Sequence, residues 1–272
     1  MMARHARFLI MALALLPVAS LSVVTRAAAQ DATQYLDLTS DEFTKSDMTR
    51  ADIEAALAAL APNATLDLSG KRLNKLDLSG MDLTRTKLQS TRLNGANLKG
   101  ANLSAVSLDQ AWALKADFSD AKLIGASLFQ TQLMDAMLDR ADFSNAMVGA
   151  DMSRASLLNA RFVDAMLAPD LTNQSMGLMR GVLKSAKLDG ASFKGANLVR
   201  SAFEFASLRN VDFEGANLEG SELSGADLTG ANVKNANFAK ADINGTKLVQ
   251  LRGRDAMLGL DATLNRDKAI LD

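Results

Sequence analysis

The sequence contains no cysteine, and its only histidine is His5. Disulfide bonds are therefore excluded, together with catalytic and metal sites built on cysteine. Beyond His5, no residue can act as a histidine base or as an imidazole ligand of a metal. Aromatic residues make up 5% of the chain, with one tryptophan, Trp112. The fold must find its rigidity in something other than covalent cross-links.

The charge balance is nearly even, with 30 basic and 31 acidic residues and a formal net charge of −1. A nucleic-acid binder would show a basic excess, and a decoy of DNA would show a strongly acidic one. Neither excess is present, so we expect no nucleic-acid partner. The charged side chains instead fall at positions that are expected to face solvent.

The first thirty residues have the layout of a secretory signal peptide. Arg4, His5 and Arg7 precede an apolar run over residues 8–24, and three alanines (27–29) follow it. This pattern predicts cleavage after Ala29 and a periplasmic or secreted protein with no transmembrane segment left. An uncleaved anchor is the alternative, disfavoured because the run is short and the cleavage site is good. Cleavage would remove three arginines and shift the net charge from −1 to about −4.

From Leu68 to Leu248 an apolar residue returns at almost every fifth position, and a small residue precedes it by two, as in residues 94–108 (NGANLKGANLSAVSL). An α-helix would place residues five apart about 140° around its axis, and a strand would place them on alternate faces. A chain that turns a corner every five residues can point both residues inward and stack its coils through backbone hydrogen bonds. The repeat therefore predicts an all-β solenoid.

The corners and the interruptions of the repeat also carry information. Glycine recurs two positions after the apolar centre, as at Gly100 and Gly230, where a corner needs a positive φ. The frame shortens by one residue between Val148 and Met152. It breaks again over residues 168–180, an irregular insert that contains a proline.

The A-[DN]-L-x-x pattern at residues 196–198, 216–218 and 226–228 resembles the pentapeptide repeat family. The resemblance implies a right-handed quadrilateral parallel β-helix with four units per coil, hence about nine coils for residues 65–250. The square cross-section and the hand are implied by the resemblance, whereas the repeat itself predicts only a solenoid.

Short helical caps are expected at both ends, because an open end of a solenoid would pair with other chains. In the N-terminal cap (residues 30–64), Thr49 and Asp52 suit a helix start and Pro62 suits its end. A partner-binding helix is the alternative there. The C-terminal cap (251–272) ends in NRDKAILD, which we interpret as a short helix. The C-terminus forms a dimer contact in some family members, so a homodimer is left open.

Two places are candidate protein contacts. Trp112, Leu114, Phe129 and Met134 take outward positions near one corner if residues twenty apart stack, and such a group suggests a contact patch. The alternative is that the insert or the N-terminal cap folds over the patch. The second place is the insert itself, where Met176 and Met179 form a candidate contact loop. That loop has its own alternative, a cover that only repairs the frame shift.

No catalytic, cofactor-binding or metal-binding constellation is recognisable. We therefore expect a non-enzymatic exported scaffold or protein-binding module with an unknown partner in the cell envelope. The family suggests a competing hypothesis, a DNA-mimicking protein that binds gyrase and protects against quinolones. That hypothesis requires a cytoplasmic location and a strongly acidic surface. An envelope enzyme using aspartate or glutamate is a third hypothesis, and it would need a cleft that a filled solenoid does not offer.

Overall fold

The computed structural model describes residues 36–169 and 180–272. The expected signal peptide and the residues Met176 and Met179 lie outside these ranges. The chain divides into two compact units, Met1–Asp37 and Leu38–Asp272, and the second unit holds every element given below. None of the helices in the described ranges has the length and apolar character that crossing a membrane requires.

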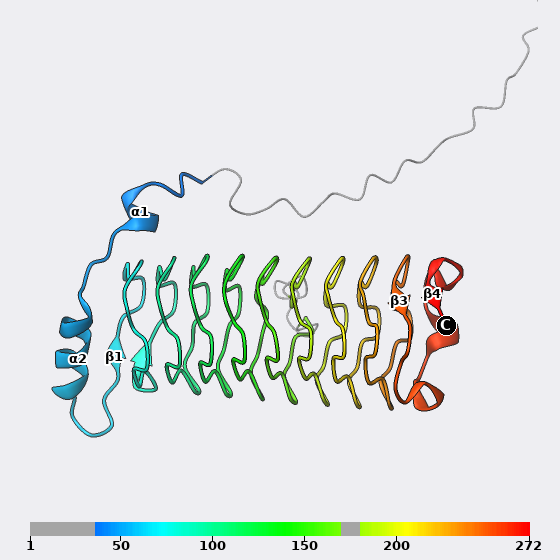
Figure 1. The fold of residues 1–272 in the computed structure, drawn as a ribbon. Coiled ribbons are helices and arrows are strands. Elements are labelled where there is room, and N and C mark those ends of the chain that lie inside the picture. The colour runs from blue at the N-terminus through cyan, green and yellow to red at the C-terminus, as the bar shows by residue number, and fades with distance from the viewer. Residues whose placement is uncertain (1–35, 170–179) are drawn as a thin grey trace, which may run out of the picture. The chain divides into compact units, whose positions relative to one another are not determined.

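Within the described residues, regular secondary structure is confined to short elements (Figure 1). The helices are α1 (Asp41–Thr44) and α2 (Arg50–Ala58), and the strands are β1 (Leu66–Asp67), β2 (Thr86–Lys87), β3 (Lys247–Leu248) and β4 (Ile270–Leu271). Three single-turn 3₁₀ helices, η1 (Arg254–Ala256), η2 (Leu260–Ala262) and η3 (Arg266–Lys268), lie between β3 and β4. Strand β1 pairs with β2, and β3 pairs with β4, both in parallel.

Between these elements the chain forms stacked coils held by single parallel bridges. Trp112 bridges Arg92 on one side and Gln132 on the other, so residues twenty apart are neighbours. Each bridge brings a pair of backbone hydrogen bonds, such as Leu93 N to Trp112 O at 2.6 Å. Twenty residues per coil give four sides of five residues, which confirms the expected stacking. A side is too short for a longer strand, because the chain turns before a third ladder residue can pair.

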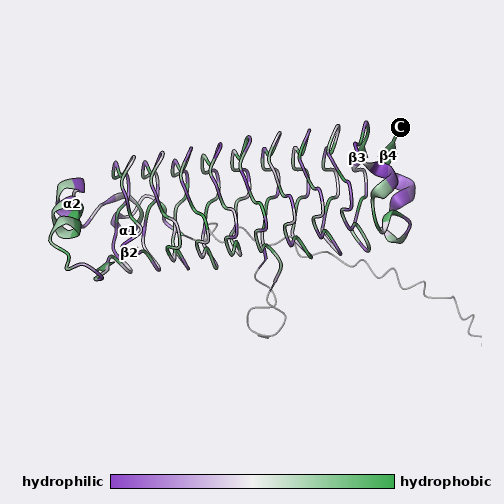
Figure 2. Cartoon of the chain, turned by 90° about the horizontal axis from the view of Figure 1, so that it is seen from below, coloured by the Kyte–Doolittle hydropathy of each residue, from purple (hydrophilic) through white to green (hydrophobic). Residues whose placement is uncertain are grey.

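Two of the four ladders matter for function. Side 1 contains Ser107, Ser127, Met147, Met166, Asn197, Asn217, Asn237 and Leu258. Side 2 contains Arg72, Arg92, Trp112, Gln132, Asp151, Val182, Ala202, Glu222, Asp242 and Leu264. Hydrophobic and hydrophilic residues alternate along every coil (Figure 2), as expected for a chain with one inward and one outward face.

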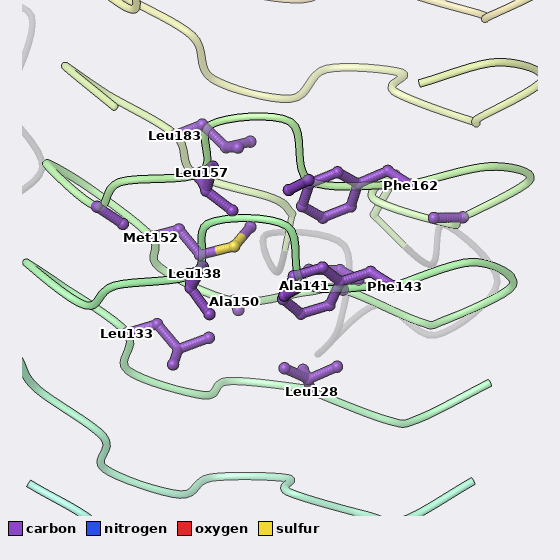
Figure 3. Close-up of a cluster of buried hydrophobic side chains, with 14 of the residues drawn as sticks. Leu128, Leu133, Leu138, Ala141, Phe143, Ala150, Met152, Leu157, Phe162 and Leu183 are labelled. Carbon is purple, nitrogen blue, oxygen red and sulfur yellow. The ribbon is translucent and has the colours of Figure 1, made fainter. Parts of the chain in front are cut away.

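The interior is filled by the apolar centres and the small residues that precede them. Leu128, Leu133 and Leu138 point inward from successive sides of one coil, and all three are at most 1% exposed (Figure 3). On one side the centres are phenylalanines that stack from coil to coil. Their ring centroids are 4.7 Å apart for Phe143 and Phe162, which equals the spacing of stacked strands. The repeat thus predicts the core correctly.

The corners are less dependent on glycine than expected. Gly100 has a φ of 66°, but Gln110 and Gln130 take the same left-handed conformation, with φ of 60° and 56°. A non-glycine residue accepts this conformation at a modest cost when the surrounding coil determines the turn. Corner positions are therefore free to carry functional side chains.

Helix α2 begins as predicted. Thr49 accepts a hydrogen bond from the backbone of Asp52, whose carboxylate accepts one from the backbone of Thr49 in return. Ile53 of this helix is fully buried, and Met48 and Leu57 pack against the core. The helix ends at Ala58, before Pro62. The four-residue helix α1, which precedes it, has no counterpart in the predictions.

The tail after residue 250 continues the coil instead of leaving it. Arg252, Leu258 and Leu264 bridge the preceding coil at intervals of six residues. Each six-residue side, GRDAML and GLDATL among them, begins with a left-handed residue and a 3₁₀ turn. The expected helix in NRDKAILD is thus the three-residue turn η3 followed by strand β4. Leu251, Met257, Leu260 and Ala269 pack against the core from this last coil.

Candidate functional site

The corner between side 1 and side 2 is irregular in two successive coils. In earlier coils it turns through a left-handed residue, Ser90, Gln110 or Gln130. The shortened unit from Val148 to Met152 has no such residue, so Gly149, Ala150 and Asp151 cut the corner. In the next coil, the same corner carries the insert between Leu167 and Gly181. A frame shift visible in the sequence therefore alters the surface at one defined place.

The insert leaves and rejoins the coil at one point. Gly181 N donates to Leu167 O at 2.8 Å, while Ala168 N donates to Asn197 O at 3.1 Å. A Cβ atom on Gly181 would lie 2.8 Å from Leu167 Cδ2, which explains why this position is glycine. The ladder continues past the insert, since Met166 bridges Asn197 and Asp151 bridges Val182. The neck therefore preserves the register of both neighbouring sides.

A groove of about 490 Å³ follows this corner across several coils. One wall is the corner row of Ser90, Gln110 and Gln130, and the other is the side-2 row of Arg92, Trp112, Gln132 and Asp151. Gly149 and Ala150 lie where the corner is cut, and Arg180 and Val182 close the far end at the insert neck. The lining combines uncharged polar side chains (Ser90, Gln110, Gln130 and Gln132), charged ones (Arg92, Asp151 and Arg180) and apolar or small residues.

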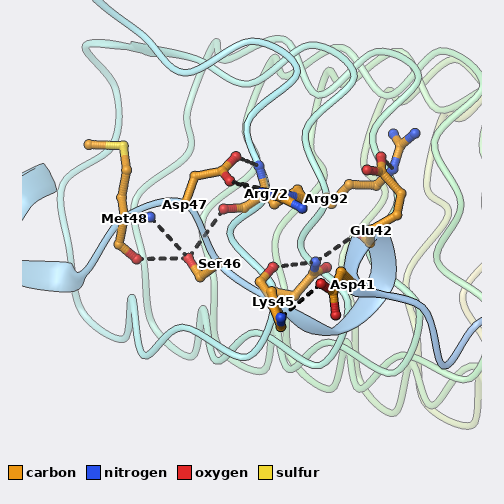
Figure 4. Close-up of polar contacts among 9 residues, drawn as sticks. Asp41, Glu42, Lys45, Ser46, Asp47, Met48, Arg72 and Arg92 are labelled. Atoms are coloured by element: carbon orange, nitrogen blue, oxygen red, sulfur yellow. Dashed lines mark hydrogen bonds and ion pairs between the residues drawn. The ribbon is translucent and has the colours of Figure 1, made fainter.

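The N-terminal end of the groove is held by α1. Glu42 Oε1 lies 3.0 Å from Arg92 Nε as an ion pair (Figure 4), although Nε makes no hydrogen bond. Phe43 meets Trp112 edge-on at 5.5 Å, and the Arg92 guanidinium lies 5.6 Å from the centre of the Trp112 ring. Asn74 Nδ2 donates to the carbonyls of Glu42 and Lys45. These contacts fix the orientation of Trp112.

Of the predicted patch, the structure leaves only part at the surface. Trp112 lines the groove and is half-buried, as are Leu114 and Phe129. Met134 is only 2% exposed, so the expectation that it faces outward is wrong. The equivalent positions Asn94 (8%) and Ser153 (9%) are buried too, whereas Leu114, one coil before Met134, is half-buried. The contact between Phe43 and Trp112 agrees with the alternative in which the N-terminal segment covers part of the patch.

The far end of the groove is a charged cluster. Arg180 donates to Glu222 Oε2 at 2.9 Å and to the carbonyl of Arg200 at 2.6 Å. Lys184 Nζ lies 2.8 Å from Glu204 Oε1. Burial raises the pKa of Glu204, which is also hydrogen-bonded to Glu222. Burial also acts to raise the pKa of Glu222, but the hydrogen bond from Glu204 and the charge of Arg180 outweigh it and lower the pKa. The positive charge of Arg180 is thus neutralised within the chain.

Side 1 carries exposed apolar side chains beside the insert neck. Met147 is 58% exposed and Met166, its neighbour on the ladder, is 46% exposed. Sequence reasoning missed this pair, because one residue lies before the frame shift and the other after it. Counting ladder positions across the shift would have found it.

Within residues 36–169 and 180–272, no group of three or more aspartate, glutamate, histidine or cysteine side chains is placed to hold a metal ion. The groove also holds no pairing of a nucleophile with a base. Its amides, guanidinium groups, indole and single carboxylate are groups that bind through hydrogen bonds.

Parallel coils with four five-residue sides, a filled interior and a surface groove define a β-helical repeat solenoid. The family model described as pentapeptide repeats matches residues 67–100, 101–136, 116–148, 182–215 and 216–250. The chain therefore belongs to the pentapeptide repeat family, and its fold is a right-handed β-helix.

Solved structures of other family members are similar. HetL, a pentapeptide repeat protein involved in heterocyst differentiation regulation in the cyanobacterium Nostoc sp. strain PCC 7120, is 26% identical, with a TM-score of 0.58. The match covers 82% of this chain and 94% of HetL. QnrB1, a plasmid-mediated fluoroquinolone resistance protein, is 18% identical over 77% of this chain and 92% of its own, with a TM-score of 0.36. A comparison with curated proteins finds no match.

Proposed function

We propose that this protein is a non-enzymatic, exported scaffold or protein-binding module of the cell envelope. It acts through the outer face of a rigid solenoid of about nine coils, with α2 and the last coil as caps. Pentapeptide repeat proteins are generally structural or binding modules, and the N-terminal sequence pattern supports export. The buried Ile53 of α2 and the apolar residues of the last coil support capping, because they cover the ends of the core.

The observation that carries protein binding is the exposed pair Met147 and Met166 on side 1. Contiguous exposed apolar side chains indicate an interaction site, and methionine adapts its shape to a partner. Earlier positions of the same ladder are Ser107 and Ser127, so the apolar character is local to these two coils. We keep Met176 and Met179 of the adjoining insert as part of the proposed contact.

A photocrosslinking experiment tests this contact. A photoreactive residue at Met147, at Met166 or at Met179 should give the same discrete adduct in the source cells, and excess unlabelled protein should compete it away. The matched control carries the photoreactive residue at Lys122, which is exposed on another side of the solenoid. Adducts that form equally well from Lys122 would refute the proposal, and so would adducts from the probe at Met179 that survive in the double variant Met147→Ser/Met166→Ser.

The cellular location of the protein discriminates between this function and the gyrase-binding alternative. We expect an intact mass that begins at Gln30 in the periplasmic or secreted fraction. A full-length species in the cytosol would refute export, and inhibition of gyrase would then be the assay to perform. An even charge balance disfavours the alternative, because imitation of DNA needs a strongly acidic surface.

A further inference from the structure

We propose that the groove beside Trp112 binds a linear, uncharged oligosaccharide. This site is separate from the protein contact proposed above, because it lies on side 2 and its corner, whereas the methionine pair lies on side 1. The inference therefore goes beyond the proposed function and does not depend on it.

The first argument is the direction of the groove. It crosses the coils of Ser90, Gln110, Gln130, Gly149 and Arg180, and so runs along the solenoid axis. At about 4.8 Å per coil its length is roughly 19 Å. The corner row offers one polar side chain in each of three successive coils, Ser90, Gln110 and Gln130, and a pyranose ring in a linear glycan advances by about one coil spacing. A linear sugar can therefore place successive rings against successive side chains.

The second argument is unused hydrogen-bonding capacity. Among the described residues, the side-chain amide of Gln130 and the indole N–H of Trp112 make no hydrogen bond. Gln110 has only a long contact of 3.4 Å from Ser90 Oγ, and Asp151 uses only Oδ1, toward Ser153. Amides both donate and accept, an indole donates and a carboxylate accepts. Together these groups match the hydroxyl groups of a sugar, which donate and accept as well.

The third argument is that the charges at both ends are already paired. Arg92 lies against Glu42, and Arg180 is hydrogen-bonded to Glu222. A polyanion such as a nucleic acid would need unpaired cations along its path. Asp151 would also repel it. The electrostatics of the groove therefore favour an uncharged ligand.

The fourth argument concerns peptides. An extended peptide usually binds by pairing its backbone with a free strand edge. Side 2 has no such edge at the groove, because Trp112 N donates to Thr91 O and Ala113 N donates to Gln132 O. The backbone of Trp112 and Ala113 is therefore not available to a ligand. The ring of Trp112, fixed by its contact with Phe43, supplies apolar surface of the kind that suits the C–H face of a sugar ring.

Because Trp112 is the only tryptophan in the chain, its fluorescence reports on the groove directly. The probes are cellotetraose and chitotetraose, each compared with its disaccharide, with a tetragalacturonate as the anionic control. We expect a saturable change with at least one neutral tetrasaccharide, at least tenfold weaker binding of its disaccharide, and little effect of added salt. Gln110→Met/Gln130→Met should weaken binding at least tenfold with an unchanged circular dichroism spectrum.

The matched control is Lys115→Met, an exposed residue with the same left-handed backbone at the next corner of the coil. It should bind like the unaltered protein. The proposal is overturned if neither tetrasaccharide saturates the signal, or if only tetragalacturonate binds and salt abolishes the effect. It is also overturned if the glutamine variant and Lys115→Met bind equally well. None of these results bears on the crosslinking at Met147, so the two proposals fail independently.

Discussion

Phe162 stacks face to face on Phe143, with ring centroids 4.7 Å apart and planes 2° apart. Phe193 continues the stack on the other side of Phe162, at 4.7 Å and 9°. The stack crosses the coil that carries the insert neck, since Phe162 precedes the insert and Phe193 follows it. The core is thus continuous where the surface is interrupted.

Replacing Phe162 by alanine tests the contribution of this stack. The change removes a fully buried ring from between two others, and we expect the free energy of unfolding to fall by about 3–5 kcal/mol. Denaturant titration measures the loss. Phe205→Ala is the control, because Phe205 is 71% exposed and its loss should change stability by no more than about 0.5 kcal/mol. Equal losses in the free energy of unfolding of the two variants would show that the buried ring of Phe162 contributes no more to stability than an exposed one.

The carboxylate of Asp227 links stability to pH. Burial acts to raise its pKa, but hydrogen bonds from Thr229 and Arg209 outweigh that effect and lower the pKa to about 2, from an ordinary value of 3.8. A carboxyl with a lowered folded-state pKa stabilises the fold above its unfolded pKa, and this contribution is lost as the pH falls from 3.8 toward 2. We expect Asp227→Asn to destabilise the protein at neutral pH and to flatten its stability profile in that window. Asp261→Asn is the control, because this carboxylate is 91% exposed in its ion pair with Arg266 and its loss should change stability at neutral pH by no more than about 0.5 kcal/mol.

Alanine substitutions at two glycines distinguish the stability lost to backbone strain from the stability lost to a steric clash of the added Cβ. Gly245 and Gly259 both have positive φ, of 66° and 72°. A Cβ on Gly245 would meet nothing within 4 Å, whereas a Cβ on Gly259 would lie 2.5 Å from Ala239 N. We expect Gly245→Ala to cost about 1–2 kcal/mol and Gly259→Ala to cost about 1–3 kcal/mol more. Thermal unfolding of both variants measures the difference in stability. Similar losses of stability in the two variants would contradict the predicted clash at Gly259.

The last coil carries exposed apolar residues on three sides, Leu258 (54%), Leu264 (55%) and Ile270 (50%). We predict that two chains associate through the last coil, because exposed apolar side chains gathered in one place favour a protein contact. Light scattering should give the mass of a dimer for the unaltered protein and of a monomer for Leu264→Lys. Met137→Lys, at a residue of similar exposure (47%) on an earlier coil, should remain dimeric. A monomeric unaltered protein would remove this prediction.

The five-residue frame was enough to predict the interior. It located Phe143, Phe162 and Leu183 correctly on both sides of two interruptions, because burial in a filled tube depends only on position within the repeat. Ala113 breaks the pattern of large apolar residues, yet it occupies a centre of the frame and is fully buried.

The groove could not be predicted in the same way. Its ingredients, the shortened unit after Val148 and the insert, were visible in the sequence, but their vertical alignment depends on which corner each occupies. Helix α1 was missed because four residues are too few for a helical period to show. The tail was misread as a helix although Gly253, Gly259 and Asn265 recur every six residues. A change of period, from five to six, was the signal that would have revealed it.

The hydrogen bond from Gly181 N to Leu167 O closes the neck of the insert, so that the chain leaves the coil and re-enters it at the same point. The ladders on both sides pass it without a shift, since Met166 bridges Asn197 and Asp151 bridges Val182. The stacking of the coils therefore depends on the order of the sides and not on the number of residues between them. A segment of another length or composition could therefore be inserted between Ala168 and Arg180 with the contacts of these two residues and of both ladders retained, which makes the neck a suitable place to attach a new module.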